Sequence, residues 1–310
     1  PAWDNSLFED NAEFGLGMFL GTQSVRNGLA DDAKKAIEEG LGSEALQAAL
    51  KDWVENLDNG NGTRDRADRL EALLAAEKGE DELLNKLYEN RDYFVKRSQW
   101  IFGGDGWAYD IGYGGVDHVL ASGADVNVFV FDTEVYSNTG GQASKASNIG
   151  QVAQFAAAGK ETKKKSLAEI AMSYGYIYVA QIAMGANPAQ TIKAITEAEA
   201  YHGPSLIIGY SPCEMHSIKG GMMNCQKEMK KAVECGYWNL FRFNPAAEKK
   251  FTLDSKAPAG GYHDFLMNEA RYSRLTREFP ERATVLFAKN EANAKERYEH
   301  LLKLVDMYDK

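Results

Sequence analysis

The sequence predicts an α/β fold: a mainly parallel sheet with helices on both faces, preceded by a helical insertion and followed by a helical C-terminal tail. Short apolar runs rich in Val, Ile and Phe alternate with helical patterns through residues 97–245, which is typical of βαβ units. Residues 1–96 and 246–310 lack such runs and show helical periodicity instead. A chain of 310 residues can also bury one substantial core and a smaller helical unit.

The N-terminal part, residues 24–96, has the pattern of polar helices. One helix follows Ser43, a favourable N-cap, and its apolar residues recur at helical spacing: Leu46, Leu50, Trp53, Val54 and Leu57. Further helices are expected over 64–76 and 80–93. No catalytic constellation occurs here, so we interpret this part as helical packaging.

Strands are expected at five places in the central part: 98–103, 126–132, 176–182, 205–210 and 237–243. Asn187-Pro188 is a strong helix start, with Asn as cap and Pro at the first helical position, and Gly203-Pro204 ends that helix. Strands that alternate with such helices form a sheet that is mainly parallel. The tail from Pro245 predicts a loop and then two helical stretches.

Composition excludes several classes of protein. A net charge of −10 argues against a nucleic-acid-binding protein, and the lysine run 163–165 is interpreted as a solvated helix face. No membrane span or signal peptide is visible. Three scattered cysteines predict a reducing, cytoplasmic setting. Because Pro1 rather than Met opens the sequence, we expect an excised or processed segment.

Two polar loops follow two of the expected strands. Gly103-Gly104-Asp105-Gly106-Trp107 comes after the strand at 98–103, and the stretch 132–142 (DTEVYSNTGGQ) comes after the strand at 126–132. Asp105 and Thr133 are 28 residues apart, the length of one βαβ crossover. Because ligands of parallel sheets gather at the carboxyl ends of strands, these loops predict one shared site.

The oxygens in these loops suit a magnesium ion that carries a diphosphate. Magnesium prefers octahedral oxygen ligands and usually takes few from the protein. Asp105 is the natural charged ligand, and Thr133 or the adjacent Asp132 carboxylate is a second. A backbone carbonyl just beyond, for example that of Val135, is expected as a third.

The glycines of the loops have a role beside the ligands. Gly104 and Gly106 allow the backbone to approach a phosphate, and Gly140-Gly141 offers N–H groups to anionic oxygen. Trp107 either packs over the cofactor or fills the core. Alone, a Gly-Asp-Gly sequence is most often an ordinary turn. Two other phosphate motifs are excluded, since the third glycine of a dinucleotide fingerprint is missing after Gly114 and no glycine precedes Lys145.

At this point the sequence resembles a known family. Gly-Asp-Gly followed by an Asn-bearing loop is the thiamine diphosphate motif. The longer text, GGDGWAYDIGYGG and then FDTEVYSNTGGQASKAS, is similar to the C-terminal thiamine-diphosphate-binding domain of single-chain pyruvate:ferredoxin (flavodoxin) oxidoreductases. The resemblance runs from about Ser6 to about Lys256 and includes the segment 211–216 (SPCEMH).

The resemblance implies roles for single residues. The side chains of Asp105 and Thr133 and the carbonyl of Val135 are implied as magnesium ligands. Asn138 is implied to lie near the substrate and the thiazolium ring. Cys213 is implied as one ligand of the [4Fe–4S] cluster nearest the cofactor.

The resemblance also implies an activity, the oxidative decarboxylation of pyruvate with CoA to acetyl-CoA and CO₂. Electrons would pass through iron–sulfur clusters to ferredoxin or flavodoxin, in a homodimer that includes further domains of the same enzyme. One of these domains would supply the glutamate that activates the cofactor, so the chain alone is expected to be inactive. Two alternatives stay open: another thiamine enzyme, such as a decarboxylase or synthase, and an isolated domain that binds the cofactor without catalysis.

The cysteines depart from the pattern of a complete cluster site. A [4Fe–4S] cluster needs four thiolates, whereas Cys213, Cys225 and Cys235 lie 12 and 10 residues apart with no C-x-x-C pair. Cys225 and Cys235 are therefore interpreted as structural, and an inert thiol is the alternative for Cys213. His118 and His216 are either proton carriers or residues that only stabilise their surroundings.

Overall fold

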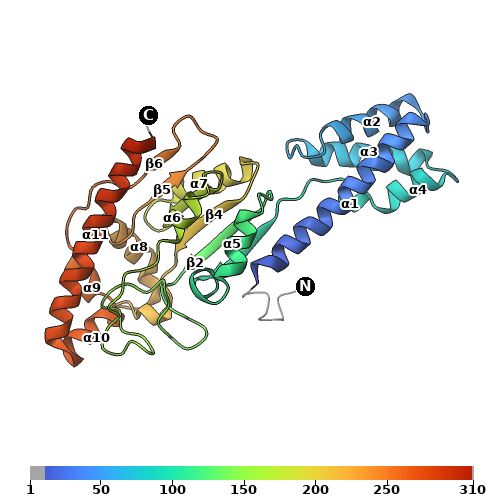
Figure 1. Ribbon diagram of the computed structural model, residues 1–310. Coiled ribbons are helices and arrows are strands. Elements are labelled where there is room, and N and C mark those ends of the chain that lie inside the picture. The colour runs from blue at the N-terminus through green and yellow to red at the C-terminus, as the bar shows by residue number, and fades with distance from the viewer. Residues whose placement is uncertain (1–10, 309–310) are drawn as a thin grey trace. The chain divides into compact units, whose positions relative to one another are not determined.

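The computed structural model describes residues 11–308 (Figure 1). These form two compact units, one made of residues 16–99 and one made of the described parts of 1–15 and 100–310. Each unit is described by itself.

The helical unit contains most of α1 (Ala12–Glu38), together with α2 (Glu44–Glu55), α3 (Thr63–Glu77), α4 (Glu82–Glu89) and the short 3₁₀ helix η3 (Arg91–Tyr93). The helices expected from 43 to 93 are thereby present, and Ser43 caps α2 by accepting a hydrogen bond from the Leu46 N–H at 3.3 Å. Trp53 lies at the centre of the core, where its indole N–H donates to the Phe94 carbonyl at 2.9 Å. The Arg26 guanidinium donates to the same carbonyl at 3.1 Å.

The second unit is built on a six-stranded sheet of order β1-β2-β4-β3-β5-β6. Its strands are β1 (Trp100–Gly104), β2 (Asn127–Asp132), β3 (Tyr178–Ile182), β4 (Ser205–Tyr210), β5 (Phe241–Phe243) and β6 (Phe251–Leu253). The first four pair in parallel, while β5 and β6 are antiparallel. This confirms the predicted fold class. The strand β6 was not expected, since three residues in a polar tail give little periodic signal.

Helices connect and cover the strands. They are η4 (Gly106–Asp110, a π-helix), α5 (Tyr113–Ala121), α6 (Leu167–Met172), α7 (Pro188–Ala200), η5 (Glu214–His216), η6 (Met222–Asn224), α8 (Cys225–Glu234), α9 (Tyr262–Met267), α10 (Ala270–Glu278) and α11 (Pro280–Tyr308). The cap of α7 is as predicted, with the Asn187 side chain accepting from the Gln190 N–H at 3.0 Å. Up to residue 308, the tail holds three helices rather than two, because Pro280 begins a new helix after α10.

The tail belongs to the same compact unit as the sheet. Helix α11 runs along the β5–β6 end (Figure 1), where the Tyr308 ring packs against Phe243 with centroids 5.1 Å apart. At the other end of the sheet, the described residues leave the cover incomplete. Phe102 on β1 and Phe131 on β2 are stacked at 6.0 Å and keep 50% and 43% of their surface exposed.

The register brings the predicted loops to one edge. Gly104 at the end of β1 pairs with Phe131, and Asp132 at the end of β2 pairs with Tyr210 of β4. The segments that follow β1, β2 and β4 therefore leave the sheet side by side. A hydrogen bond of 3.0 Å from the Ser211 N–H to the Asp132 carbonyl continues the pairing beyond the strands.

Candidate functional site

Three oxygen atoms meet where β1 and β2 end. The Thr133 hydroxyl lies 2.5 Å from Asp105 Oδ1 and 2.9 Å from the Val135 carbonyl oxygen. The Thr133 N–H also points to Asp105 Oδ1, at 3.3 Å. The Thr133 hydroxyl has one proton and can donate it to only one of these two acceptors at a time. A cation bound here would therefore be a favourable partner for the other oxygen.

Asp105 itself is buried, and its second oxygen, Oδ2, has no hydrogen-bond partner among the described residues. Burial, together with the nearby Asp132 carboxylate, raises the pKa of Asp105 to about 7, although the hydrogen bond from Thr133 opposes this. A buried carboxylate oxygen with no partner is costly. A cation bound at Asp105 would remove that cost.

The donor set fits magnesium. Two side-chain oxygens and one carbonyl are hard ligands, and magnesium completes its shell with phosphate oxygen and water. Within residues 11–308, no group of three or more His, Cys, Asp or Glu side chains is arranged to hold a metal ion. An ion at Asp105 would therefore depend on oxygens supplied by a ligand such as a diphosphate.

The carboxylate of Asp132, the alternative ligand, already has hydrogen-bond and ion-pair partners within the protein. Its carboxylate lies 2.7 Å from the Lys164 ammonium, accepts from the Tyr109 hydroxyl at 2.7 Å and accepts from the Glu134 N–H at 3.2 Å. The side chain is fully buried. Of the two candidates for a second ligand, Thr133 is therefore the one beside Asp105.

The glycines of the first loop differ in what surrounds them. A Cβ on Gly103 would lie 2.2 Å from the Trp107 ring, and one on Gly106 would lie 2.4 Å from the Tyr136 ring, whereas Gly104 faces open space. Gly104 is thus the residue where a ligand can approach the backbone. Trp107 is buried against Gly103, which is the core-filling arrangement, although its indole N–H has no hydrogen-bond partner among the described residues.

The second loop is a tight turn. Tyr136 and Gln142 bridge its two sides, with the Tyr136 N–H donating to the Gln142 carbonyl at 3.0 Å. Gly140 and Gly141 have φ angles of 137° and 79°, which favour glycine. The turn presents Asn138 as an exposed residue.

Cys213 follows β4 on the same edge of the sheet. Its sulfur lies 3.5 Å from His216 Nδ1, and its backbone N–H donates to that nitrogen at 3.1 Å. Burial, aided by Arg271 and Lys164, lowers the pKa of His216 well below its usual value, so the neutral ring stabilises this segment. Cys235 is buried, which raises the pKa of its thiol to about 12.

The sequence interpretation missed three residues in the site: Glu134, Lys164 and Arg271. The carboxylate of Glu134 is buried and lies 2.8 Å from Arg271 and 3.2 Å from Lys164. Burial alone would raise the pKa of Glu134, but these two cations lower it. The interpretation of residues 163–165 as a solvated helix face is wrong: they form no helix, and the Lys164 side chain is only 11% exposed. The position of Glu134 between two expected ligands was the available signal.

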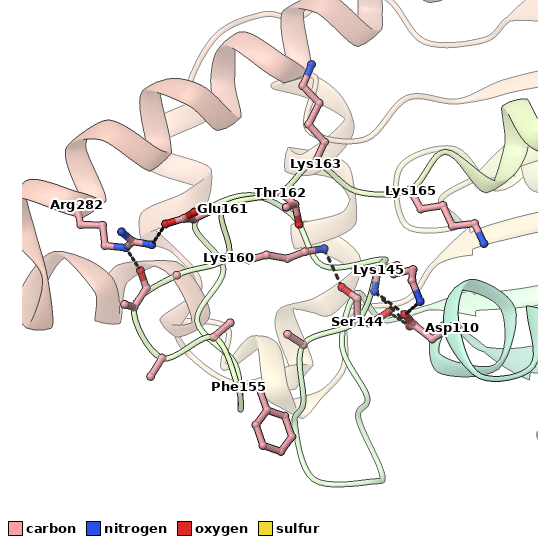
Figure 2. A pocket seen from close by; sticks show the side chains of 15 residues that line it. Asp110, Ser144, Lys145, Phe155, Lys160, Glu161, Thr162, Lys163, Lys165 and Arg282 are labelled. Carbon is pink, nitrogen blue, oxygen red and sulfur yellow. Dashed lines mark hydrogen bonds and ion pairs between the residues drawn. The ribbon is translucent and has the colours of Figure 1, made fainter.

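A cavity of about 790 Å³ is lined by Asp110, by the loop residues 143–145 and by residues 155–163 (Figure 2). Its lining includes five cationic side chains: Lys145, Lys160, Lys163, Lys165 and Arg282. All five have polar partners within the chain. Lys145 lies 3.2 Å from Asp110, Lys160 donates to the Ser144 carbonyl at 2.8 Å, and Arg282 pairs with Glu161. Lys163 pairs with Glu296, and Lys165 donates to the Tyr109 carbonyl at 3.3 Å. These cations support the loop structure around the site.

The fold is an α/β domain in which the loops after β1 and β2 bring Asp105 and Thr133 together, and its sequence is similar to thiamine-diphosphate-binding domains. Residues 91–208 match the family described as thiamine pyrophosphate enzyme, C-terminal TPP binding domain. The resemblance seen in the sequence is thereby confirmed for this part of the chain.

The relatives extend the likeness to nearly the whole chain. It is 56% identical to a pyruvate-flavodoxin oxidoreductase of Klebsiella pneumoniae, over 98% of this chain and 26% of the relative. It is 55% identical to a pyruvate:ferredoxin oxidoreductase of Moorella thermoacetica, over 99% of this chain and 27% of the relative. A mitochondrial NADP⁺-dependent pyruvate dehydrogenase of Euglena gracilis is 45% identical, over 99% of this chain and 17% of the relative. The chain thus spans about a quarter of the first two relatives and less of the third.

Each helix within residues 11–308 is too short or too polar to span a lipid bilayer.

Proposed function

We propose that this chain binds magnesium thiamine diphosphate through Asp105, Thr133 and the Val135 carbonyl, as part of a pyruvate oxidoreductase. The observation that carries the proposal is that Asp105 Oδ1 and the Val135 carbonyl oxygen lie 2.5 and 2.9 Å from the Thr133 hydroxyl. The second oxygen of the Asp105 carboxylate, beside them, has no partner among the described residues. The identity of 56% to a pyruvate-flavodoxin oxidoreductase supports the wider assignment.

Each residue has a distinct task in this proposal. Asp105 supplies the charge that holds the ion, and Thr133 and Val135 supply neutral oxygens. Gly104 and the turn at Gly140 leave room for the diphosphate, and Asn138 donates a hydrogen bond to substrate. Thiamine diphosphate, when bound, supplies the carbon nucleophile that attacks a 2-oxo group and accepts the electrons released on decarboxylation.

The whole protein would oxidise pyruvate with CoA to acetyl-CoA and CO₂. The relatives' names give flavodoxin, ferredoxin and NADP⁺, and we favour ferredoxin or flavodoxin because the two relatives with these acceptors are the more similar. Further domains of the same enzyme and a second copy of it would complete the assembly. The three cysteines are free, which supports a reducing compartment such as the cytoplasm.

Cys213 is proposed as one ligand of a [4Fe–4S] cluster. It is half-buried at the edge of the sheet that carries Asp105 and Thr133, in a loop that directly follows β4. Since the chain holds three cysteines and a cluster of this kind needs four thiolates, the remaining ligands would come from other domains.

The test is cofactor binding, measured by calorimetry with thiamine diphosphate and Mg²⁺, in the protein that contains this chain. Asp105→Ala should abolish magnesium-dependent binding, because it removes the charged ligand, and Thr133→Val should weaken it less. The matched control is Asp117→Ala on α5, which removes a carboxylate that accepts from the hydroxyls of Tyr174 at 2.9 Å and Tyr113 at 3.4 Å.

Binding by Asp105→Ala as tight as that of the unaltered protein would refute the metal site. Pyruvate-dependent reduction of ferredoxin or flavodoxin tests the reaction. Cofactor binding with turnover but no reduction of either carrier would indicate a decarboxylase or synthase, and binding without any turnover would indicate a cofactor-binding domain alone.

A further inference from the structure

Glu134 occupies the position between the two neighbouring ligands of the proposed magnesium site. Thr133 precedes it and Val135 follows it. Its φ angle is +59°, in the left-handed region that non-glycine residues rarely adopt. The residue is fully buried. A strained conformation of this kind persists only where the surroundings fix it.

Both backbone groups of Glu134 are held. Its N–H donates to Asp132 Oδ1 at 3.2 Å. Its carbonyl accepts from the Ser147 hydroxyl at 2.5 Å and from Gln151 Nε2 at 3.0 Å. These three bonds fix the two peptide groups that join Glu134 to Thr133 and Val135.

The side chain of Glu134 is held by four donors. Tyr237 OH lies at 2.5 Å, Asn148 Nδ2 at 2.7 Å, Arg271 Nη1 at 2.8 Å and Lys164 Nζ at 3.2 Å. Both carboxylate oxygens are therefore satisfied within the protein. Glu134 is not free to act as a ligand. It pairs with the cations of Lys164 and Arg271, which it shares with Asp132 and Glu269.

The loop that holds the Glu134 carbonyl is tied back to the Asp105 segment through Asp110, whose contacts with Ser144 and Lys145 are drawn in Figure 2. Asp110, at the end of the π-helix that follows Asp105, accepts from the Ser144 hydroxyl at 2.6 Å and from the Lys145 N–H at 3.0 Å. Lys160 donates to the carbonyls of Ser144 and Ser147 at 2.8 and 2.6 Å. The turn at 144–147 thus links the segment after β1 to the residue between the two ligands after β2.

From this arrangement we infer that Glu134 is a positioning residue, whose buried carboxylate fixes the left-handed backbone that aims Thr133 Oγ1 and the Val135 carbonyl at one cation. The inference rests on the proposed function. Mg²⁺ demands near-ideal octahedral ligand geometry, whereas Ca²⁺ accepts irregular geometry. A change that loosens the Glu134 backbone should therefore lower the affinity for Mg²⁺ more than the affinity for Ca²⁺.

The experiment measures the affinities of Mg²⁺ and Ca²⁺ at a fixed, saturating concentration of thiamine diphosphate, in the protein that contains this chain. Glu134→Gln keeps the size of the side chain but removes its charge. We expect it to weaken Mg²⁺ binding by about 10–100-fold, as changes to partners of metal ligands do, and to weaken Ca²⁺ binding less. Ser147→Ala is a milder change: it removes one of the two donors to the Glu134 carbonyl, together with the acceptor of the Ser144 N–H. It should shift the ratio in the same direction.

The matched control is Glu269→Gln. It also neutralises a buried carboxylate that pairs with Arg271, at 2.6 Å, but it lies outside the Thr133–Val135 segment and should leave the ratio unchanged. If Glu134→Gln and Ser147→Ala both leave the ratio unchanged, or if Glu269→Gln lowers it equally, the positioning role is refuted. An unaltered protein that binds neither ion with thiamine diphosphate refutes the proposed function instead. Should Glu134→Gln fail to fold, the ratio in Ser147→Ala decides.

Discussion

Gly141 lies against Met215: a Cβ placed on Gly141 would be 2.3 Å from the methyl carbon of that methionine. The contact joins the turn that presents Asn138 to the segment that follows Cys213. Both residues also line a cavity of about 230 Å³ with Val135 and Arg271. The proposed cofactor loop and the proposed cluster loop are therefore in direct contact at one glycine.

Gly141→Ala is expected to destabilise the protein by about 1–2 kcal/mol, the cost of a left-handed residue with a side chain, since φ is 79° here. The Met215 methyl is the free end of a flexible side chain and can move aside. Urea unfolding of Gly141→Ala with and without Met215→Ala separates the two causes. Full recovery in the double variant would show that steric contact, and not backbone strain, sets the requirement for glycine.

Asn138→Ala is expected to reduce turnover more than cofactor affinity, because the exposed amide is proposed to meet substrate while the diphosphate has other anchors. Loss of one such donor costs about 10²–10³ in rate where the hydrogen bond forms mainly in the transition state. Steady-state kinetics and calorimetry on the same variant provide the two numbers. Equal losses in both would assign Asn138 to the structure of the loop.

The two glycines beside Asp105 give a matched pair. Gly106→Ala should destabilise the protein by about 1–3 kcal/mol, because its Cβ would lie 2.4 Å from the Tyr136 ring. Gly104→Ala meets nothing within 4 Å, so its melting temperature should not fall. It should still weaken thiamine diphosphate binding if a phosphate approaches this backbone. Unchanged affinity in Gly104→Ala would place the diphosphate elsewhere.

Much of the fold followed from local sequence. The strands after which Asp105 and Thr133 lie were predicted to within a few residues, because buried parallel strands give continuous apolar runs. The approach of Asp105 to Thr133 followed from the βαβ spacing. The antiparallel β6 was not foreseen, since its three residues gain their order from pairing with β5.

The buried ion network was beyond local reasoning. Lys164 looks like a surface lysine in sequence, and it is buried only because Asp132 and Glu134, 32 and 30 residues away, meet it. The left-handed backbone of Glu134 is likewise fixed by partners as distant as Tyr237, 103 residues away. Such pairings depend on tertiary structure, and a pattern of residue types does not carry them.

Glu269 provides a pH prediction away from the metal ligands. It is buried against Arg271 at 2.6 Å. Burial raises its pKa from 4.5 to about 7, with Glu228 and Glu134 adding to the rise, although the guanidinium opposes it. Between these two values the native state holds a proton that the unfolded chain releases.

The stabilising contribution of Glu269 is thus present below pH 4.5 and is lost as the pH rises through about 7. We expect the free energy of unfolding to decline more steeply over this interval in the unaltered protein than in Glu269→Gln, which cannot ionise. Urea unfolding of both proteins at pH 5, 6, 7 and 8 measures this difference. Subtracting the two free energies of unfolding at each pH cancels the contributions of titratable groups that both proteins share. Parallel curves for the two proteins would mean that Arg271 keeps Glu269 ionised throughout, with its pKa at or below the ordinary value.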